Sequence, residues 1–323
     1  MNTGNLIKLM RNYPGFIFIL LIALLNTGCV YHESIPFSVH SNTKQNDYGV
    51  LIMAHGGSSE WNEQVLMAIK PLQNEYKIEV AFGMADAASI QKSVQKLEAR
   101  GAKRIGVIRL FVSAGSWHTR TEQILGLRAG APIMQHVSTS KPSKKKHDSH
   151  HHMQFWRIKT NASFALSKKG LSESNLMGAV LVDRAQALKR NPKKEDVLIL
   201  AHGLRNDLNN NELLESLNLL ANQIRSSIPF KRVKVETLRE DWPENSKKAK
   251  RRIHIFLQQA NNEDRTVILI PFRVYGSGPY AEVLKGFKYV SDGKGLLPHP
   301  NVTKWISDQI QILQQGSFKS ALH

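Results

Sequence analysis

The fold is decided by the stretch LIMAHGGSS at residues 51–59, which recurs as LILAHGLRN at residues 198–206. In both copies an apolar run of strand length ends in His-Gly, and apolar residues at helical spacing follow. A buried strand that stops at such a corner puts its histidine at the carboxyl edge of a sheet, where open α/β sheets bind ligands. The pattern therefore predicts two copies of one α/β unit, each with a histidine at its binding edge.

The composition indicates a folded protein with a strong positive charge. The chain has 323 residues, of which 41% are hydrophobic and 22% charged, enough for two domains with cores. A formal net charge of +18 favours nucleic acid, an anionic membrane or a polyanionic small molecule as partner. No nucleic-acid motif occurs, and outside residues 144–146 and 247–252 the basic residues are dispersed. We therefore expect no nucleic-acid partner, and solvated helix faces account for most of the excess charge.

The N-terminal residues have the pattern of an export signal. Lys8 and Arg11 precede an apolar run at residues 16–25, and the single cysteine, Cys29, follows shortly after. This order is similar to a bacterial lipoprotein signal, in which the cysteine is lipidated, although Asn26 stands where leucine is usual. An uncleaved membrane anchor is the alternative, but the run is short for a span. We expect an exported protein, membrane-anchored on the periplasmic or cell-surface side.

Strands and helices alternate along the rest of the chain, which predicts an α/β fold of two tandem units with parallel sheets flanked by helices. Each unit has the order strand, His-Gly corner, helix, strand, helix, strand, glycine corner, helix. Strands are expected at residues 48–54, 78–82, 104–111 and 131–137, and in the second unit at 197–201, 233–238 and 266–272. Asn301 is expected to cap a closing helix.

These patterns divide the chain into consecutive segments. They are a lipoprotein-type signal (1–29), a tether (30–47), a first unit (48–137), a Lys/His-rich insertion (138–153), a connecting segment (154–190), a second unit (191–315) and a tail (316–323).

The first unit carries a candidate metal site. His55 and His118 both follow predicted strands, and the carboxyl ends of parallel strands meet at one edge. Two neutral imidazoles there would bind a divalent transition metal and leave positions open for water and substrate. Glu122 lies one helical turn after His118, where it would orient the imidazole or accept a proton. The alternative is that strand-end histidines are ordinary polar loop residues.

The second unit keeps the first histidine and loses the second. His202 ends its first strand, but Gly-Ser-Gly-Pro-Tyr at residues 276–280 replaces the corner that contains His118. Glu282 is expected to stand where Glu122 does. We therefore predict one more active site in the first unit and a partly degenerate site in the second.

Two further groups of histidines are candidates of lower weight. The tract HDSHHH contributes an accessory metal loop of delivery or buffering type, made of His147, His150, His151 and His152. The alternative is a tolerated low-complexity insertion. His299, in a Pro-His-Pro turn, is expected to have a structural role rather than a chemical one.

Other classes of site find no support in the sequence. There is no Walker-type glycine loop, no Gly-x-Ser-x-Gly elbow and no spaced cysteine cluster. The short glycine corner at residues 276–278 is too little to indicate a nucleotide. No nucleotide cofactor is expected, and oligomeric state is not predicted.

The motifs around these residues resemble a known family. The His-Gly corner at His55, the GAKRI run at residues 101–105 and the Gly-x-x-His at residues 115–118 resemble the class II chelatases. More narrowly, they resemble the CbiX-type sirohydrochlorin cobaltochelatases in a two-unit form. The ending GLLPHPNVTKW at residues 295–305 is also similar to long two-unit members. The similarity covers roughly residues 48–315.

The resemblance implies two flavodoxin-like, chelatase-like units around a cleft that holds a tetrapyrrole. It implies insertion of Co²⁺, with Ni²⁺ or Fe²⁺ as alternatives, by a lyase that needs no ATP. By position, His55 and His118 would be the metal-binding, proton-accepting pair, and His202 and Glu282 resemble the His and Glu of related ferrochelatases. The carboxylates of such a substrate would be attracted to a basic protein.

Two alternatives to a membrane-tethered chelatase follow from the same residues. An exported metal or tetrapyrrole carrier on the same fold, without turnover, is favoured by the export signal and the histidine tract, since fold alone does not fix function. A purely structural lipoprotein is the other, and it predicts that substitution of either histidine leaves ligand binding unchanged.

Overall fold

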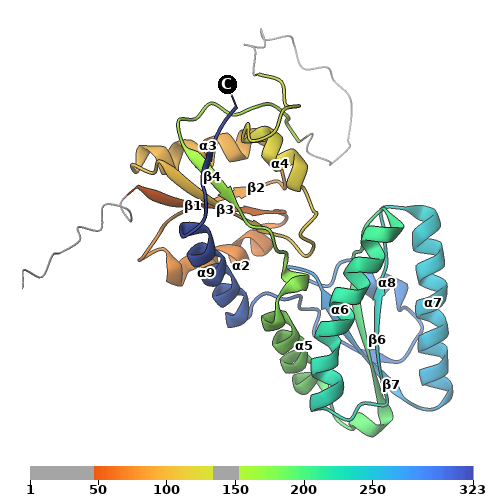
Figure 1. Cartoon of the computed structure of the whole chain (residues 1–323). Coiled ribbons are helices and arrows are strands. Elements are labelled where there is room, and N and C mark those ends of the chain that lie inside the picture. The colour runs from red at the N-terminus through yellow and green to blue at the C-terminus, as the bar shows by residue number, and fades with distance from the viewer. Residues whose placement is uncertain (1–46, 134–152, 323) are drawn as a thin grey trace, which may run out of the picture. The chain divides into compact units, whose positions relative to one another are not determined.

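The computed structural model describes residues 47–133 and 153–322, which contain two β-sheets (Figure 1). The first sheet has the strand order β2-β1-β3-β4-β9. Its strands are parallel except the last, which pairs antiparallel with β4. They are β1 (Tyr48–Ala54), β2 (Lys77–Phe82), β3 (Arg104–Leu110), β4 (Ser163–Leu166) and β9 (Lys319–Ser320).

The second sheet repeats this arrangement. Its order is β6-β5-β7-β8, and every pair is parallel. Its strands are β5 (Glu195–Ala201), β6 (Arg232–Thr237), β7 (Thr266–Phe272) and β8 (Tyr289–Val290). In both sheets the strand that ends in His-Gly lies between the second and third strands of its copy. The expected fold class, α/β with parallel sheets and helices, is confirmed.

Strand register brings the corners of each sheet to one edge. Ala54, the last residue of β1, is level with Phe82 at the end of β2 and Leu110 at the end of β3. In the second sheet, Ala201 is level with Thr237 and with the last residue of β7. The loops that follow these strands therefore begin side by side, as the sequence predicts.

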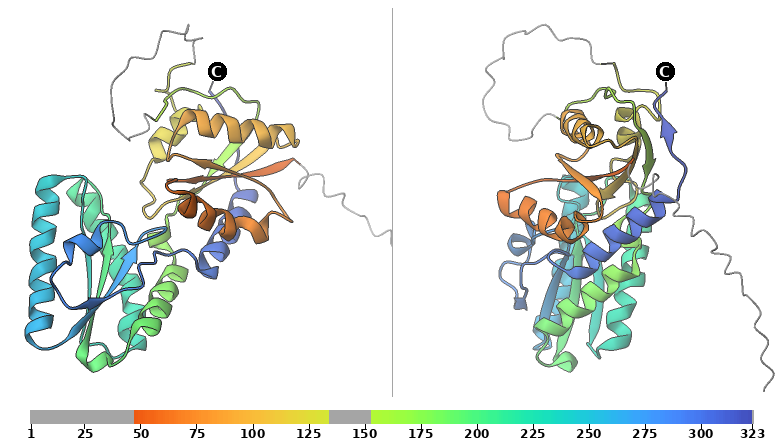
Figure 2. Two further views of the ribbon diagram at one scale, coloured as in Figure 1. Left: turned by 180° about the vertical axis from the view of Figure 1, so that it is seen from behind. Right: turned by 90° about the vertical axis from the view of Figure 1, so that its left-hand side faces the viewer.

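Alternate residues of β1 face different helices. Val50 and Ile52 pack in a cluster with α2 (Ser59–Ile69), whereas Leu51 and Met53 pack with α3 (Ala87–Ala99). The two helices therefore cover opposite faces of the sheet (Figure 2). Residues buried on both sides explain why β1 is a continuous apolar run rather than an alternating one.

The first two helices of the first unit begin with side-chain caps. Ser58 is the N-cap of α2, and its hydroxyl accepts a hydrogen bond from the backbone N–H of Trp61 at 3.2 Å. Asp86 caps α3 in the same way, accepting from the N–H of Ser89 at 2.9 Å. A short helix, α4 (His118–Ile124), follows the loop after β3.

The second sheet is covered in the same manner. Leu198 and Leu200 of β5 pack with α7 (Pro243–Asn262), while its other face packs with α6 (Asp207–Ser227). The remaining helices are α5 (Asn175–Leu188), α8 (Tyr280–Val283) and α9 (Pro300–Gln314), with short 3₁₀ turns at Lys70–Leu72, Leu171–Glu173 and Pro192–Lys194.

The closing helix α9 contacts elements of the first sheet. The sequence places it in the second unit, yet Thr303 donates to the carbonyl of Ala68 at 2.8 Å and Tyr48 donates to that of Ile310 at 3.3 Å. After α9 the chain pairs β9 with β4. An amphipathic pattern predicts that a helix buries one face, but not which sheet it covers. The segment boundaries themselves stay predictions.

One expected strand is wrong. Residues 131–137 are predicted as the fourth strand, but that position is taken by β4. Ile133 forms a single bridge with Arg157 and is 63% exposed, and residues 134–137 lie outside the described part. Phe164 and Ala165 of β4, by contrast, are buried against the core. Burial of these two side chains selects the strand.

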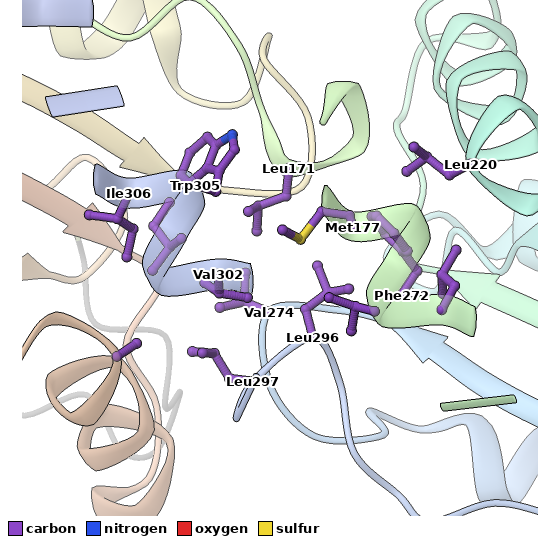
Figure 3. Close-up of a cluster of buried hydrophobic side chains, with 14 of the residues drawn as sticks. Leu171, Met177, Leu220, Phe272, Val274, Leu296, Leu297, Val302, Trp305 and Ile306 are labelled. Carbon is purple, nitrogen blue, oxygen red and sulfur yellow. The ribbon is translucent and has the colours of Figure 1, made fainter. Parts of the chain in front are cut away.

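A shared cluster of buried side chains includes residues of both sheets and of helices α5, α6 and α9. Figure 3 labels Trp305 and Ile306 of α9 together with Leu171 and Met177 among the side chains of this cluster. Full burial of each large apolar side chain contributes roughly 1.5–3 kcal/mol. Because the cluster draws on sequence-distant elements, loss of one helix would expose apolar surface on several others.

None of the described helices is both long enough and apolar enough to cross a membrane.

Candidate functional site

His55 lies at the corner after β1 with its ring exposed. Its Nδ1 is 2.6 Å from the carbonyl oxygen of Gly56, whose φ of +76° forms the turn. Because a carbonyl only accepts, Nδ1 is the donor in this contact, and in the corresponding neutral tautomer Nε2 has a free lone pair. No described residue hydrogen-bonds to that Nε2. The corner therefore presents one imidazole nitrogen ready to ligate a metal.

His202 has the same corner geometry in the second sheet. Its Nδ1 is 2.8 Å from the carbonyl of Gly203, which also has a positive φ, of +88°. Its Nε2, however, is 3.0 Å from a carboxylate oxygen of Asp241 and 3.9 Å from one of Glu240. The two histidines have the same backbone turn. They differ at Nε2, which in His202 has carboxylate neighbours.

His118 begins α4 and is held beside a carboxylate. Its Nδ1 lies 3.5 Å from Oε2 of Glu122, and Arg128 donates to that same oxygen at 2.8 Å. Burial lowers the pKa of His118, as does the positive charge of Arg109, while Glu122 opposes the change. The imidazole is therefore neutral near pH 7, the state that binds metals and accepts protons.

Arg109 is a residue that sequence reasoning missed. Its side chain is 1% exposed, and burial lowers its pKa to about 10. The guanidinium donates to the carbonyls of Ala114 at 2.7 Å, Ser116 at 3.0 Å and Ser167 at 2.7 Å. It thereby fixes the loop that leads to His118. The available signal is an arginine inside an otherwise apolar strand.

The predicted pair is placed on neighbouring strand ends. β1 and β3 are hydrogen-bonded partners, so the loops bearing His55 and His118 start side by side. Among residues 47–133 and 153–322, no three His, Cys, Asp or Glu side chains gather around one metal position. Two imidazole ligands would leave several coordination positions for water and substrate. The roles of His55, His118 and Glu122 stay predictions.

At the corner after β7, Tyr280 takes the place of His118, because each is the first residue of the helix that follows. Its ring is buried, with the guanidinium carbon of Arg273 5.7 Å from the ring centroid. Burial raises the pKa of its hydroxyl above the ordinary range. The site is therefore filled by an aromatic ring rather than by an imidazole.

Glu282 is not the acid that the structure places at His202. It is exposed on α8, and it forms no ion pair within the described residues. The acids at His202 are Glu240 and Asp241, which follow the end of β6. Glu240 is also paired with Arg273 at 2.7 Å. A carboxyl-edge rule applied to β6 would have found both.

His299 has the structural role that is expected of it. It is the N-cap of α9, and its Nδ1 accepts from the backbone N–H of Asn301 at 3.1 Å. Its Nε2 lies 3.0 Å from Asp183. The prediction of Asn301 as the cap is wrong by two positions, because Pro300 already occupies the first helical position. Cys29 and the histidines at 147, 150, 151 and 152 lie outside the described residues.

Two cavities lie near these corners. One of about 570 Å³ adjoins His118 and Glu122 and extends along the end of β4. The other, of about 490 Å³, lies on the basic face of α7 and reaches Glu240. The volumes suit small molecules or parts of them.

Comparison with known proteins gives a family match and a fold match. Residues 49–187 match the family CbiX. No curated protein matches the sequence.

Two solved structures match 82% of this chain, and each match covers 94% of the chain in that structure. One is the sirohydrochlorin chelatase SirB from Bacillus subtilis subspecies spizizenii in complex with cobalt, with 12% identity and a TM-score of 0.52. The other is SirB from Bacillus subtilis with Fe³⁺, with 13% identity and a TM-score of 0.55. At these identities the likeness concerns the fold.

Proposed function

We propose that the chain inserts a divalent metal into a sirohydrochlorin-like tetrapyrrole, and the match of residues 49–187 to the CbiX family supports this. We favour Co²⁺, with Ni²⁺ or Fe²⁺ as alternatives. The observation that carries the proposal is the His118–Glu122 pair at the carboxyl edge of the first sheet, with the open Nε2 of His55 on the neighbouring strand.

The metal is a substrate that must be held and then released. Imidazole binds Co²⁺, Ni²⁺ and Fe²⁺, and a site with few protein ligands leaves positions for ring nitrogens. His55 and His118 would bind the incoming ion. Similar folds hold cobalt in one solved SirB structure and Fe³⁺ in another, which supports a transition metal without selecting one.

Metal insertion also requires that two ring N–H protons leave the macrocycle. His118 is suited to accept one, because burial lowers its pKa and keeps the ring neutral. Glu122 lies 3.5 Å from that ring and would stabilise the imidazolium that forms. Arg128 fixes Glu122 in place at 2.8 Å. The pair thus combines a proton acceptor with a group that stabilises the product charge.

The corner of the second unit differs from that of the first in two respects. His202 Nε2 is occupied by Asp241, and Tyr280 fills the position that corresponds to His118. We therefore assign turnover to the first unit alone.

Export and lipid anchoring remain part of the proposal and rest on sequence. The supporting pattern is the basic start, the apolar run and Cys29. Mass spectrometry of the mature protein tests it. An acylated Cys29 at the new N-terminus is expected, whereas an intact Met1 with an unmodified thiol would contradict it.

The activity is tested by absorbance. Purified full-length protein is mixed with sirohydrochlorin, Co²⁺, Ni²⁺ or Fe²⁺ is added in turn, and the initial rate is compared with the protein-free rate. Acceleration with many turnovers per protein is expected. A spectral change that stops at one equivalent, without acceleration, would instead identify a carrier.

A further inference from the structure

The cavity beside His118 and Glu122 continues well beyond those two residues. Its walls come from α4, from β4 and the segment after it, and from the ends of α9 and β9. Its volume of about 570 Å³ lies within the range of small-molecule sites. It is large enough for an edge of a macrocycle with its substituents rather than for a lone ion.

The cavity is rich in positive charge. Lys168, Lys169 and Lys319 line it, and all three are exposed. None of them forms an ion pair with a described residue. Glu122 is the one acid among the described lining residues, and Arg128 already binds it. The three ammonium groups are therefore available to an anionic ligand.

The same cavity offers apolar surface. Ile312 lines it and is 60% exposed. Exposed positions on a helix are normally polar, so this isoleucine is an exception. Leu127 and Leu166 are half-buried beside it. A ligand that fits must thus carry both a flat apolar part and several negative charges.

We propose that this cavity binds the carboxylate-bearing edge of the tetrapyrrole, with Lys168, Lys169 and Lys319 contacting the carboxylates and Ile312 contacting the ring. The assignment rests on the proposed function and adds the residues that select an acidic macrocycle. The cavity includes His118 and Glu122, so a ring edge bound there lies next to the proton-accepting pair.

The chain offers a matched control for the lysines. Lys168 and Lys169 are adjacent and exposed, and so are Lys193 and Lys194, in a 3₁₀ turn that does not line the cavity. Replacing either pair by glutamine removes the same charge from the protein. Only the first replacement removes it from the proposed site.

Binding is measured by quenching of the fluorescence of metal-free sirohydrochlorin with full-length protein. We expect Lys168→Gln/Lys169→Gln to raise Kd roughly fivefold at low salt, since each exposed ion pair contributes modestly. The difference should shrink as ionic strength rises. Lys193→Gln/Lys194→Gln should stay within about twofold of wild type. Equal Kd values for the wild type and both variants would overturn the proposal.

A second pair of variants tests the apolar contact. Ile312→Asp should weaken binding, whereas Ile255→Asp, at a similarly exposed isoleucine on α7, should not. The same macrocycle with its carboxylates esterified should bind the wild type and Lys168→Gln/Lys169→Gln equally. Competition by inorganic phosphate alone, with no effect of Ile312→Asp, would instead indicate a simple anion site and contradict the proposal.

The outcomes separate this inference from the proposed activity. Lysine-dependent binding without metal insertion would keep the binding site and reject the enzyme. Metal insertion by the wild type with unchanged Kd and rate in the lysine variant would keep the enzyme and reject the binding site. Absence of any binding by the wild type would reject the binding site.

Discussion

The Nε2 of His202 lies 3.0 Å from the carboxylate of Asp241, whereas the corresponding Nε2 of His55 has no partner among the described residues. The two rings share their backbone turn and the Nδ1 bond to the next carbonyl. A neighbouring acid therefore distinguishes two histidines that the sequence presents as equivalents.

This difference predicts unequal effects of substitution. His55→Ala should lower the rate of metal insertion at least about tenfold, because it removes a metal ligand, while His202→Ala should change it by less than about threefold. Initial rates at saturating substrate measure both. Equal losses in the two variants would show that the second corner takes part in turnover.

The acid side of the pH–rate profile reports on His118. Burial, Arg109 and Arg128 lower the pKa of its imidazole, so the rate should fall only when pH drops below the ordinary value of 6.5. Arg128→Gln removes a positive charge and should shift that limb to higher pH. Arg100→Gln, at an exposed arginine paired with Glu79, is the control.

The lowered pKa of His118 also predicts that the free energy of unfolding decreases at acid pH. The unfolded chain binds a proton at this histidine more readily than the folded chain does. The free energy of unfolding should therefore be unaffected above pH 6.5 and should decrease as pH falls toward the lowered pKa.

Arg109 should matter for stability and for the site together. Arg109→Ala leaves the carbonyls of Ala114, Ser116 and Ser167 without their donor and opens a cavity, so we expect a loss of about 2–4 kcal/mol in the free energy of unfolding. Denaturant titration measures it. Arg109→Lys should recover part of the loss, and unchanged stability in Arg109→Ala would contradict the assigned role.

His299 gives a contrasting prediction. Because it caps α9 and pairs with Asp183, His299→Ala should lower the free energy of unfolding by about 1 kcal/mol. The rate of metal insertion at a temperature where the protein stays folded should not change. A large loss of activity with normal stability would give this histidine a chemical role.

The strands that the sequence predicts best are those buried on both faces. The runs that end at Ala54 and Ala201 are continuously apolar because their side chains face helices on both sides. The sequence pattern does not indicate β4, because this strand is four residues long and its placement depends on burial of Phe164. The sheet covered by α9 depends on long-range packing, which no local pattern encodes.

The sequence identifies the candidate histidines but not the residues that surround them in the structure. His55 and His118 follow from apolar runs that end in polar corners, and Glu122 from helical spacing. Arg109 was missed because its partners are backbone carbonyls, which have no sequence signature. The repeat in the sequence points to Glu282 as the acid of the second unit, whereas Asp241 follows the end of β6 and has no counterpart in that repeat.

The central claim is tested most directly by the initial rate of Co²⁺ insertion into sirohydrochlorin by wild type and His118→Ala, each checked for folding by circular dichroism. Wild type should exceed the protein-free rate by orders of magnitude, and His118→Ala should lose most of that excess. A folded His118→Ala protein that is as fast as wild type would contradict the account.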